Sequence, residues 1–201
     1  MSTESRPLRA VAVSGSLTAP SRTTALVEAI TEAFGRVLPI ESHLIALNEL
    51  GPHLAGALTR KQLPPEAEAE LQRIENADLL VVATPVYRAS FTGLFKYLFD
   101  FVDQYALVDT PVLLAATGGS ERHALIIEHQ LRPLFGFFQS LALPVGVYAL
   151  DSDFTDYAVS SEQLAERIDK AIERALPLVR SSLVEKETVE RTLAGEDVSA
   201  D

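Results

Sequence analysis

Short runs of apolar residues recur along the chain, and most of them end at small polar residues. The runs span residues 8–13, 79–83, 111–116 and 144–150, and a weaker one spans residues 43–47. A continuous apolar run of this length predicts a strand that is buried on both faces, as the strands of parallel sheets are. We therefore expect these five segments to form a parallel sheet.

Segments with a helical spacing of apolar residues separate these runs. One begins at Ser21 and ends near Gly35, and another has Pro65 in its first turn. Three more are expected over about residues 92–104, 122–141 and 161–179. Because strands and helices alternate, the chain is predicted to be an α/β protein, a flavodoxin-like three-layer sandwich with a five-stranded parallel sheet.

The length and composition fit one domain. The chain has 201 residues, of which 47% are hydrophobic, and this is enough for a single buried core. We assign the flavodoxin-like domain to residues 1–180, with an irregular stretch rich in glycine and proline between about residues 48 and 64. Residues 181–201 are rich in charge and poor in large apolar groups, so an acidic, loosely ordered tail is expected there.

The composition argues against several kinds of function. Cysteine is absent, so thiolate chemistry and a disulfide framework are excluded. The formal charge of -11 disfavours nucleic-acid binding. The four histidines lack the spacing of a zinc site, and the motifs of a P-loop, a Rossmann loop and a nucleophile elbow are missing. With no secretory signal and no run of about 18 apolar residues, a cytoplasmic protein without a membrane anchor is expected.

A loop rich in hydroxyl groups follows the first predicted strand and leads into a helix. It contains Ser14, Ser16, Ser21, Arg22 and Thr23. Free backbone N–H groups at the start of the helix, hydroxyl donors and a guanidinium together suit a dianionic phosphate. The simpler alternative is a helix cap by Ser21, with Arg22 in solvent.

Two further loops of unusual composition follow the third and fourth predicted strands. Their residues are Pro85, Val86, Tyr87, Arg88 and Ser90 in one loop and Thr117, Gly118, Gly119 and Ser120 in the other. An apolar, aromatic loop offers a stacking face and N–H groups to a flat ring, and glycine lets the backbone approach a ligand closely. Ordinary structural turns are the alternative. In a parallel sheet all three loops lie at the same edge, where ligands bind.

These three segments resemble those of the NAD(P)H-dependent FMN reductase family. Within that family the chain is most similar to the reductase components of alkanesulfonate or methanesulfonate monooxygenase systems. The resemblance extends from about residue 8 to residue 179, and residues 117–138 are its most specific part. It implies that the first loop holds the FMN phosphate, that the second flanks the flavin ring, and that the third completes the pocket.

The resemblance also implies a reaction. FMN and NAD(P)H are the expected cofactors, and hydride passes from the nicotinamide to the flavin, which is then released to a flavin-dependent monooxygenase. No catalytic side chain and no metal ion are expected, because the chemistry belongs to the flavin. Two other functions stay open: a quinone or azo reductase that keeps its flavin bound, and a flavodoxin-type electron carrier that docks redox partners through an acidic surface.

The helix predicted from Thr92 has apolar residues on more than one face. Leu94, Phe95, Tyr97 and Leu98 belong to this set. A surface helix needs only one apolar stripe, so the second face is expected to meet another subunit. The family resemblance implies a homodimer or homotetramer. Burial of both faces within one domain is the alternative.

A proline interrupts the helix predicted over residues 122–141. Pro133 lacks an N–H group, and its ring clashes with the carbonyl of His129, so the helix must kink or widen there. Some reductases of the family have an inserted aromatic residue and a π-helix at the position that His129 occupies. A π-bulge and a simple proline kink are both left open.

Overall fold

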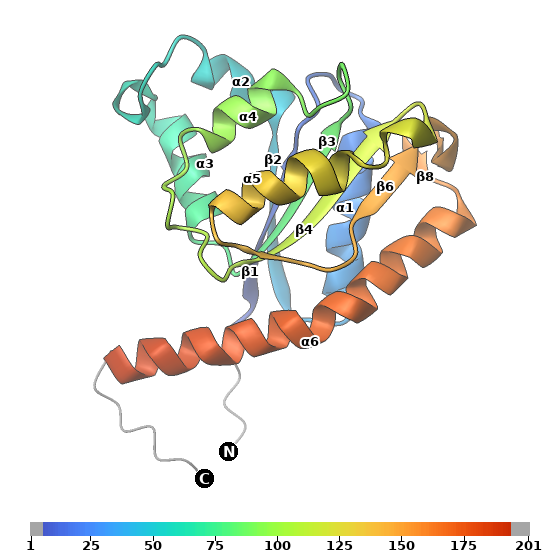
Figure 1. Ribbon diagram of the computed structural model, residues 1–201. Coiled ribbons are helices and arrows are strands. Elements are labelled where there is room, and N and C mark those ends of the chain that lie inside the picture. Colours follow the sequence, from blue (N-terminus) through green and yellow to red (C-terminus); the bar gives the residue numbers. More distant parts are fainter. Residues whose placement is uncertain (1–5, 194–201) are drawn as a thin grey trace.

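The computed structural model describes residues 6–193, and strands alternate with helices through most of this part of the chain (Figure 1). The strands are β1 Leu8–Ser14, β2 Ile40–Ala46, β3 Leu79–Pro85, β4 Pro111–Gly118, β5 Leu141–Ala142, β6 Val147–Leu150, β7 Phe154–Thr155 and β8 Ala158–Val159. The α-helices are α1 Arg22–Gly35, α2 Leu47–Leu54, α3 Pro65–Glu75, α4 Gly93–Phe99, α5 Arg132–Phe137 and α6 Glu162–Leu193.

The main sheet is parallel, and its strands follow the order β2-β1-β3-β4-β5, with β6 also paired to β4. This is the order of flavodoxin-like folds, and it reverses between β1 and β3. The sheet order therefore confirms the predicted fold class. At the point of reversal, the loops after β1 and β3 diverge to opposite faces of the sheet and leave room for a ligand.

The last strand of the predicted five is divided into two short pieces. β5 pairs with the beginning of β4, at Pro111 and Val112, whereas β6 pairs with its end, over residues 115–118. The connection contains Pro144, which has no N–H group for a ladder. It also contains Gly146, where a Cβ atom would lie 2.6 Å from Ile127 Cγ2. The single strand predicted over residues 144–150 is therefore shorter in the structure, beginning at Val147.

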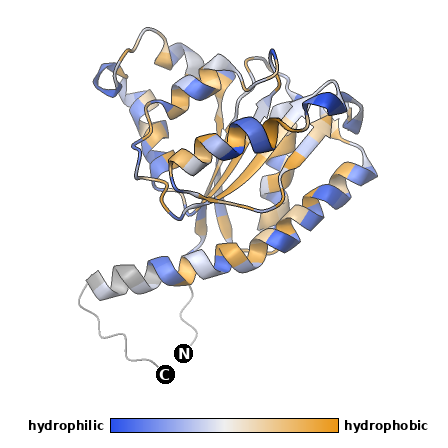
Figure 2. Ribbon diagram, viewed as in Figure 1, coloured by the Kyte–Doolittle hydropathy of each residue, from blue (hydrophilic) through white to orange (hydrophobic). Residues whose placement is uncertain are grey.

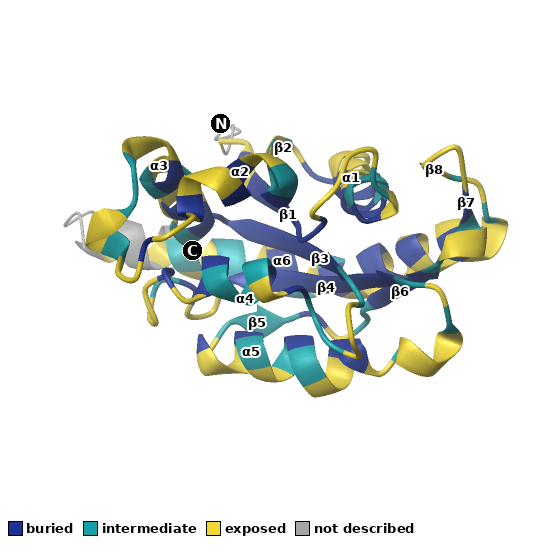
Figure 3. Ribbon diagram, turned by 90° about the horizontal axis from the view of Figure 1, so that it is seen from above, coloured by how far each residue is buried: buried dark blue, intermediate teal, exposed yellow. Residues whose placement is uncertain are grey.

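Helices cover both faces of the sheet, and each face has its own apolar core. α1 and α6 cover one face, and α2 to α5 cover the other. Figure 2 shows the apolar residues gathered on the strands and on the inward sides of the helices. Figure 3 shows the strands buried between two helical layers, so the sheet forms a rigid platform for the loops at its ends.

A short helix occupies part of the stretch that was expected to be irregular. α2 buries Leu47, Leu50 and Leu54, which lie on one face of the helix. Gly51 is also buried, and a Cβ atom there would lie 2.6 Å from Leu94 Cδ2. The expectation of an irregular stretch is wrong for residues 48–54, because burial of the helically spaced leucines outweighs the helix-breaking tendency of Gly51 and Pro52.

One apolar face of the segment after Thr92 is buried within the chain, and the other is partly buried. α4 ends at Phe99, earlier than predicted, and Phe95, Leu98 and Phe99 are almost completely inaccessible to solvent. Phe101 and Val102, in the turn that follows, are also buried. Leu94 and Tyr97, on the other side of the helix, are only partly buried against the same core, so the expected subunit interface stays a prediction.

The predicted helix over residues 122–141 consists of three consecutive pieces, and the middle one is a π-helix. It spans Ile127–Leu131, between a short 3-10 turn, Glu121–His123, and α5. The N–H group of Arg132 donates to the carbonyl of Ile127, five residues earlier, which is the hydrogen bond of a π-helix. The widened turn contains His129, so of the two predicted alternatives the π-bulge is confirmed.

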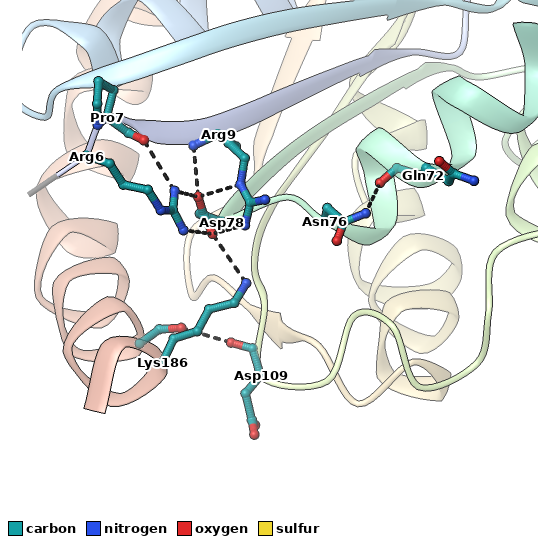
Figure 4. Close-up of polar contacts among 9 residues, drawn as sticks. Arg6, Pro7, Arg9, Gln72, Asn76, Asp78, Asp109 and Lys186 are labelled. Atoms are coloured by element: carbon teal, nitrogen blue, oxygen red, sulfur yellow. Dashed lines mark hydrogen bonds and ion pairs between the residues drawn. The ribbon is translucent and has the colours of Figure 1, made fainter. Parts of the chain in front are cut away.

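The segment expected to be a loose tail is helical as far as the structure describes it. α6 continues without interruption past residue 180 to Leu193, so a loosely ordered tail is wrong for residues 181–193. Leu183 packs against the core, and Lys186 Nζ lies 3.3 Å from Asp78 Oδ1 (Figure 4). Composition misled the prediction because charged residues are also strong helix formers. Residues 194–201 lie outside the described part of the chain.

Candidate functional site

Three loops meet at the edge of the sheet where the parallel strands end, and Figure 3 looks onto this edge. We call them the phosphate loop (residues 14–23), the ring loop (residues 85–91) and the glycine loop (residues 117–120). Thr92 Oγ1, which caps α4 just after the ring loop, donates to the carbonyl of Gly15 at 3.1 Å. The N–H group of Val86 donates to the carbonyl of Thr117 at 2.8 Å. The predicted loops are therefore brought together by direct hydrogen bonds.

The phosphate loop ends in a capped helix start. Ser21 Oγ accepts hydrogen bonds from the N–H groups of Thr23 and Thr24, at 3.1 and 3.2 Å. The helix that follows has no acidic residue in its first turn, so no carboxylate of that turn opposes its positive end. The cap by Ser21 that sequence reasoning left as an alternative is present, and it lies beside the proposed phosphate position.

Three other hydroxyl groups of this loop, those of Ser14, Ser16 and Thr23, have partners inside the protein. Ser14 is buried and its hydroxyl group lies 2.8 Å from Thr24 Oγ1, while Ser16 Oγ donates to the carbonyl of Thr18. Thr23 Oγ1 lies 2.7 Å from Thr117 Oγ1, in a buried contact between the phosphate and glycine loops. These contacts fix the shape of the loop, and its more accessible polar side chains are Thr18, Ser21 and Arg22.

Arg22 lies at the surface of the site and contacts two residues that sequence reasoning missed. Its Nη1 atom lies 3.6 Å from Asp151 Oδ1, and its guanidinium carbon lies 5.4 Å from the centroid of the Tyr157 ring. Asp151 directly follows β6, so it stands at the same edge as the other site residues. The rule that ligands bind at strand ends could have found Asp151, whereas Tyr157 gave no signal in the sequence.

The ring loop is a tight turn with an exposed aromatic residue at its start. Tyr87 and Ser90 exchange backbone hydrogen bonds of 2.9 and 3.1 Å, and Tyr87 is 47% exposed. Arg88 and Ala89 between them both have positive φ angles, 51° and 68°. Such a conformation is uncommon for residues other than glycine and is found where a structure holds a loop in a functional shape.

A side chain from the π-helix supports the ring loop. Ser90 Oγ donates to Gln130 Oε1 at 3.1 Å, so the widened turn is in direct contact with this part of the site. Sequence reasoning left a π-bulge near His129 open beside a proline kink and did not predict this contact, because the contact depends on which way the widened turn points its side chains.

The glycine loop is shaped by Tyr148. A Cβ atom on Gly118 would overlap the Tyr148 hydroxyl oxygen, so only glycine fits there. The hydroxyl group donates to the carbonyl of Ser120 at 2.7 Å. Burial, and then the nearby Asp151 carboxylate, raises the pKa of Tyr148, so its hydroxyl group stays protonated as a donor. Gly118 was expected to admit a ligand, and the structure shows that it admits the Tyr148 side chain.

The chemistry of these residues fits FMN. The helix start, with Ser21 and Arg22, supplies positive charge and donors without a nearby lysine, which suits a single phosphate group. Val86 is half-buried and Tyr87 is exposed, so both offer apolar surface, which suits a flat heterocycle. The part of the chain that the structure describes has no group of three or more acidic or histidine side chains that could hold a metal ion.

Comparison with known proteins identifies the family. Residues 8–155 match the model of a family described as NADPH-dependent FMN reductase. The chain belongs to the NADPH-dependent FMN reductase family. This membership confirms the predicted enzyme class, an NAD(P)H:FMN oxidoreductase, and the predicted cofactors FMN and NAD(P)H.

Individual FMN reductases are similar over most of their length. The NADH-dependent FMN reductase SfnF of Pseudomonas fluorescens is 59% identical over 179 residues, which cover 89% of this chain and 96% of that protein. An NADPH-dependent FMN reductase of Pseudomonas aeruginosa is 55% identical over 86% of this chain and 92% of its own. The crystal structure of an oxidoreductase from Corynebacterium diphtheriae superposes with a TM-score of 0.74 at 35% identity, and the match covers 88% of this chain and 99% of that one.

Proposed function

We propose that this FMN reductase takes FMN as an exchangeable substrate and releases reduced FMN to a separate flavin-dependent monooxygenase that acts on a sulfonate. The observation that supports this best is the meeting of the three loops at one open edge of the sheet, where Arg22 and Tyr87 are both partly exposed. A site at an open edge suits a flavin that must enter and leave. The likeness to SfnF supports the activity, and the resemblance to sulfonate systems supports the partner.

Each loop has its own role in this proposal. Ser21 and Arg22, with the hydroxyl-rich segment from Ser14 to Thr23, hold the phosphate group. The ring loop, with Pro85, Val86, Tyr87, Arg88 and Ser90, flanks the flavin ring, and the residues from Thr117 to Ser120 complete the pocket. When bound, FMN accepts hydride from the nicotinamide and so supplies the chemistry. The protein binds and orients the two partners and excludes water, and none of its side chains needs to move a proton.

The assembly and the location of the protein remain predictions. Among residues 6–193 no helix has the length and apolar character needed to cross a membrane. A homodimer or homotetramer and a cytoplasmic location are proposed from the sequence and the family resemblance alone.

Steady-state oxidation of NADH and NADPH tests the proposed activity. FMN, FAD, riboflavin and a quinone are compared side by side as electron acceptors. We expect fast oxidation with free FMN, because the site is built for a flavin monophosphate. Faster turnover with the quinone would favour the flavin-bound quinone reductase, and tightly retained FMN with slow oxidation of both nucleotides would favour the electron carrier.

Substitution of Arg22 tests the phosphate position. Arg22→Ala should weaken FMN binding about 10-fold, because a charge-assisted hydrogen bond is lost, and should leave riboflavin binding unchanged. Quenching of flavin fluorescence gives both dissociation constants. Equal losses for the two flavins would show that Arg22 does not contact the phosphate.

A further inference from the structure

Asp151 lies between two of the loops that we assign to FMN. β6 pairs with β4 so that Leu150 is opposite Gly118, and Asp151 therefore leaves the sheet at the level of Gly119. A Cβ atom on Gly119 would lie 3.5 Å from Asp151 Oδ2, while the other carboxylate oxygen, Oδ1, lies 3.6 Å from Arg22 Nη1. One carboxylate thus contacts the phosphate loop and lies beside the glycine loop.

The β7–β8 hairpin holds the Arg22 guanidinium on a second side. Tyr157, in the turn of this hairpin, lies beneath the guanidinium, and the distance of 5.4 Å is that of a cation–π contact. The base of the hairpin is fixed because Asp153 Oδ2 accepts from the N–H group of Leu150 at 2.7 Å, and the carbonyl of Asp153 accepts from Ser160. The ring of Tyr157, on a hairpin fixed by these hydrogen bonds, therefore helps to hold the guanidinium near Asp151.

We infer that Asp151 sets the affinity for FMN, because its carboxylate competes with the flavin phosphate for the Arg22 guanidinium. The inference deepens the proposed function and rests on it, since it requires that Arg22 face the phosphate. A phosphate monoester has a charge of about -1.5 to -2 at neutral pH, so a carboxylate that shares its guanidinium also repels it. Asp151 thus keeps FMN exchangeable, as a reductase that releases its flavin requires.

The expected size of the effect follows from the exposure of the pair. The side chains of Arg22 and Asp151 are 42% and 58% exposed, so water and salt screen their interaction. An exposed ion pair is weak, and the added repulsion of the phosphate strengthens the effect only moderately. We expect removal of the Asp151 charge to tighten FMN binding about 3-fold to 10-fold.

Asp151→Asn tests this inference through the binding of two flavins. Titration by fluorescence quenching should give a lower dissociation constant for FMN and an unchanged one for riboflavin, which has no phosphate. Asp156→Asn is the matched control, because it removes the same charge from an exposed position in the neighbouring β7–β8 hairpin. Asp156 has a φ angle of 48°, which asparagine tolerates, so the control should fold and bind both flavins as the unaltered protein does.

The Arg22→Ala background separates competition from general repulsion. Without the guanidinium, Asp151→Asn should lose most of its effect on FMN. If Arg22→Ala weakens FMN binding but Asp151→Asn does not tighten it, competition between Asp151 and the phosphate for Arg22 is refuted. The assignment of Arg22 to the phosphate then still stands. Equal tightening by Asp156→Asn would also overturn the inference, because the effect would then be one of net charge. If Arg22→Ala does not discriminate between the flavins, the phosphate position and the inference both fall.

Discussion

The hydroxyl groups of Thr23 and Thr117 lie 2.7 Å apart and join the start of α1 to the end of β4. Both residues are buried, and they are 94 residues apart in the sequence. The contact ties the phosphate loop to the glycine loop, so it couples two parts of the candidate site within the core.

This contact predicts a specific pattern of stability. Thr23→Val or Thr117→Val should lower the free energy of unfolding by about 1 to 3 kcal/mol, because each leaves one buried hydroxyl group without its partner. The double variant should lose less than the sum of the two, since no unpaired hydroxyl group remains. Urea unfolding measures all three, and strict additivity would show that the two hydroxyl groups do not interact.

The close approach of Tyr148 to Gly118 gives a second prediction. Gly118→Ala should destabilise the fold by about 1 to 3 kcal/mol, because the added methyl group would overlap the Tyr148 hydroxyl oxygen. Tyr148→Phe removes that oxygen, so in the Gly118→Ala background it should restore part of the lost stability. Thermal and urea unfolding measure this recovery. A Gly118→Ala variant as stable as the unaltered protein would contradict the expected overlap.

The ionisation of Asp78 gives a prediction of how the stability of the fold depends on pH. Burial alone would raise the pKa of this carboxyl group, but hydrogen bonds from Arg6 and Arg9 outweigh it and hold the pKa well below the ordinary value of 3.8 (Figure 4). A carboxyl group with a lowered pKa stabilises the fold fully above its ordinary pKa, and this stabilisation is lost as the pH falls toward the lowered value.

Asp78→Asn should therefore destabilise the protein by about 1 to 3 kcal/mol at pH 7, with the loss moderated because both arginines are half-exposed. The difference from the unaltered protein should stay constant between pH 7 and pH 5 and shrink below about pH 4. Urea unfolding at a series of pH values gives the comparison. A difference that does not change with pH would show that the charge of Asp78 does not stabilise the fold.

The π-helix gives a prediction about flavin release. Deleting His129 removes one residue from the widened turn, so a regular helix should form and the segment that supports Ser90 should stiffen. We expect FMN to dissociate more slowly and the oligomeric state to change. His129→Ala is the control, because it keeps the residue count and the widened turn.

Stopped-flow measurement of FMN release and light scattering after size exclusion test the two effects. If deletion and substitution both behave as the unaltered protein does, the π-helix has no part in flavin release or assembly.

The sequence by itself determined the sheet and the loops at its edge. Buried parallel strands must be apolar on both faces, so the runs that became β1, β3 and β4 were visible without a structure. The parallel order then requires that Ser21, Tyr87 and Gly118 lie at the same edge, because every strand ends there. These inferences needed only local composition and one rule of topology.

The tertiary structure decided what the side chains contact. That Asp151 and Tyr157 hold Arg22, that Gln130 supports Ser90, and that Tyr148 fills the space above Gly118 all depend on register and on the widened turn. The extent to which the chain itself covers α4 and the attachment of α6 through Lys186 were also hidden, because composition reports how apolar a segment is and not what covers it. Contacts between residues far apart in sequence arise only when the chain is folded, since packing selects them and no local pattern encodes them.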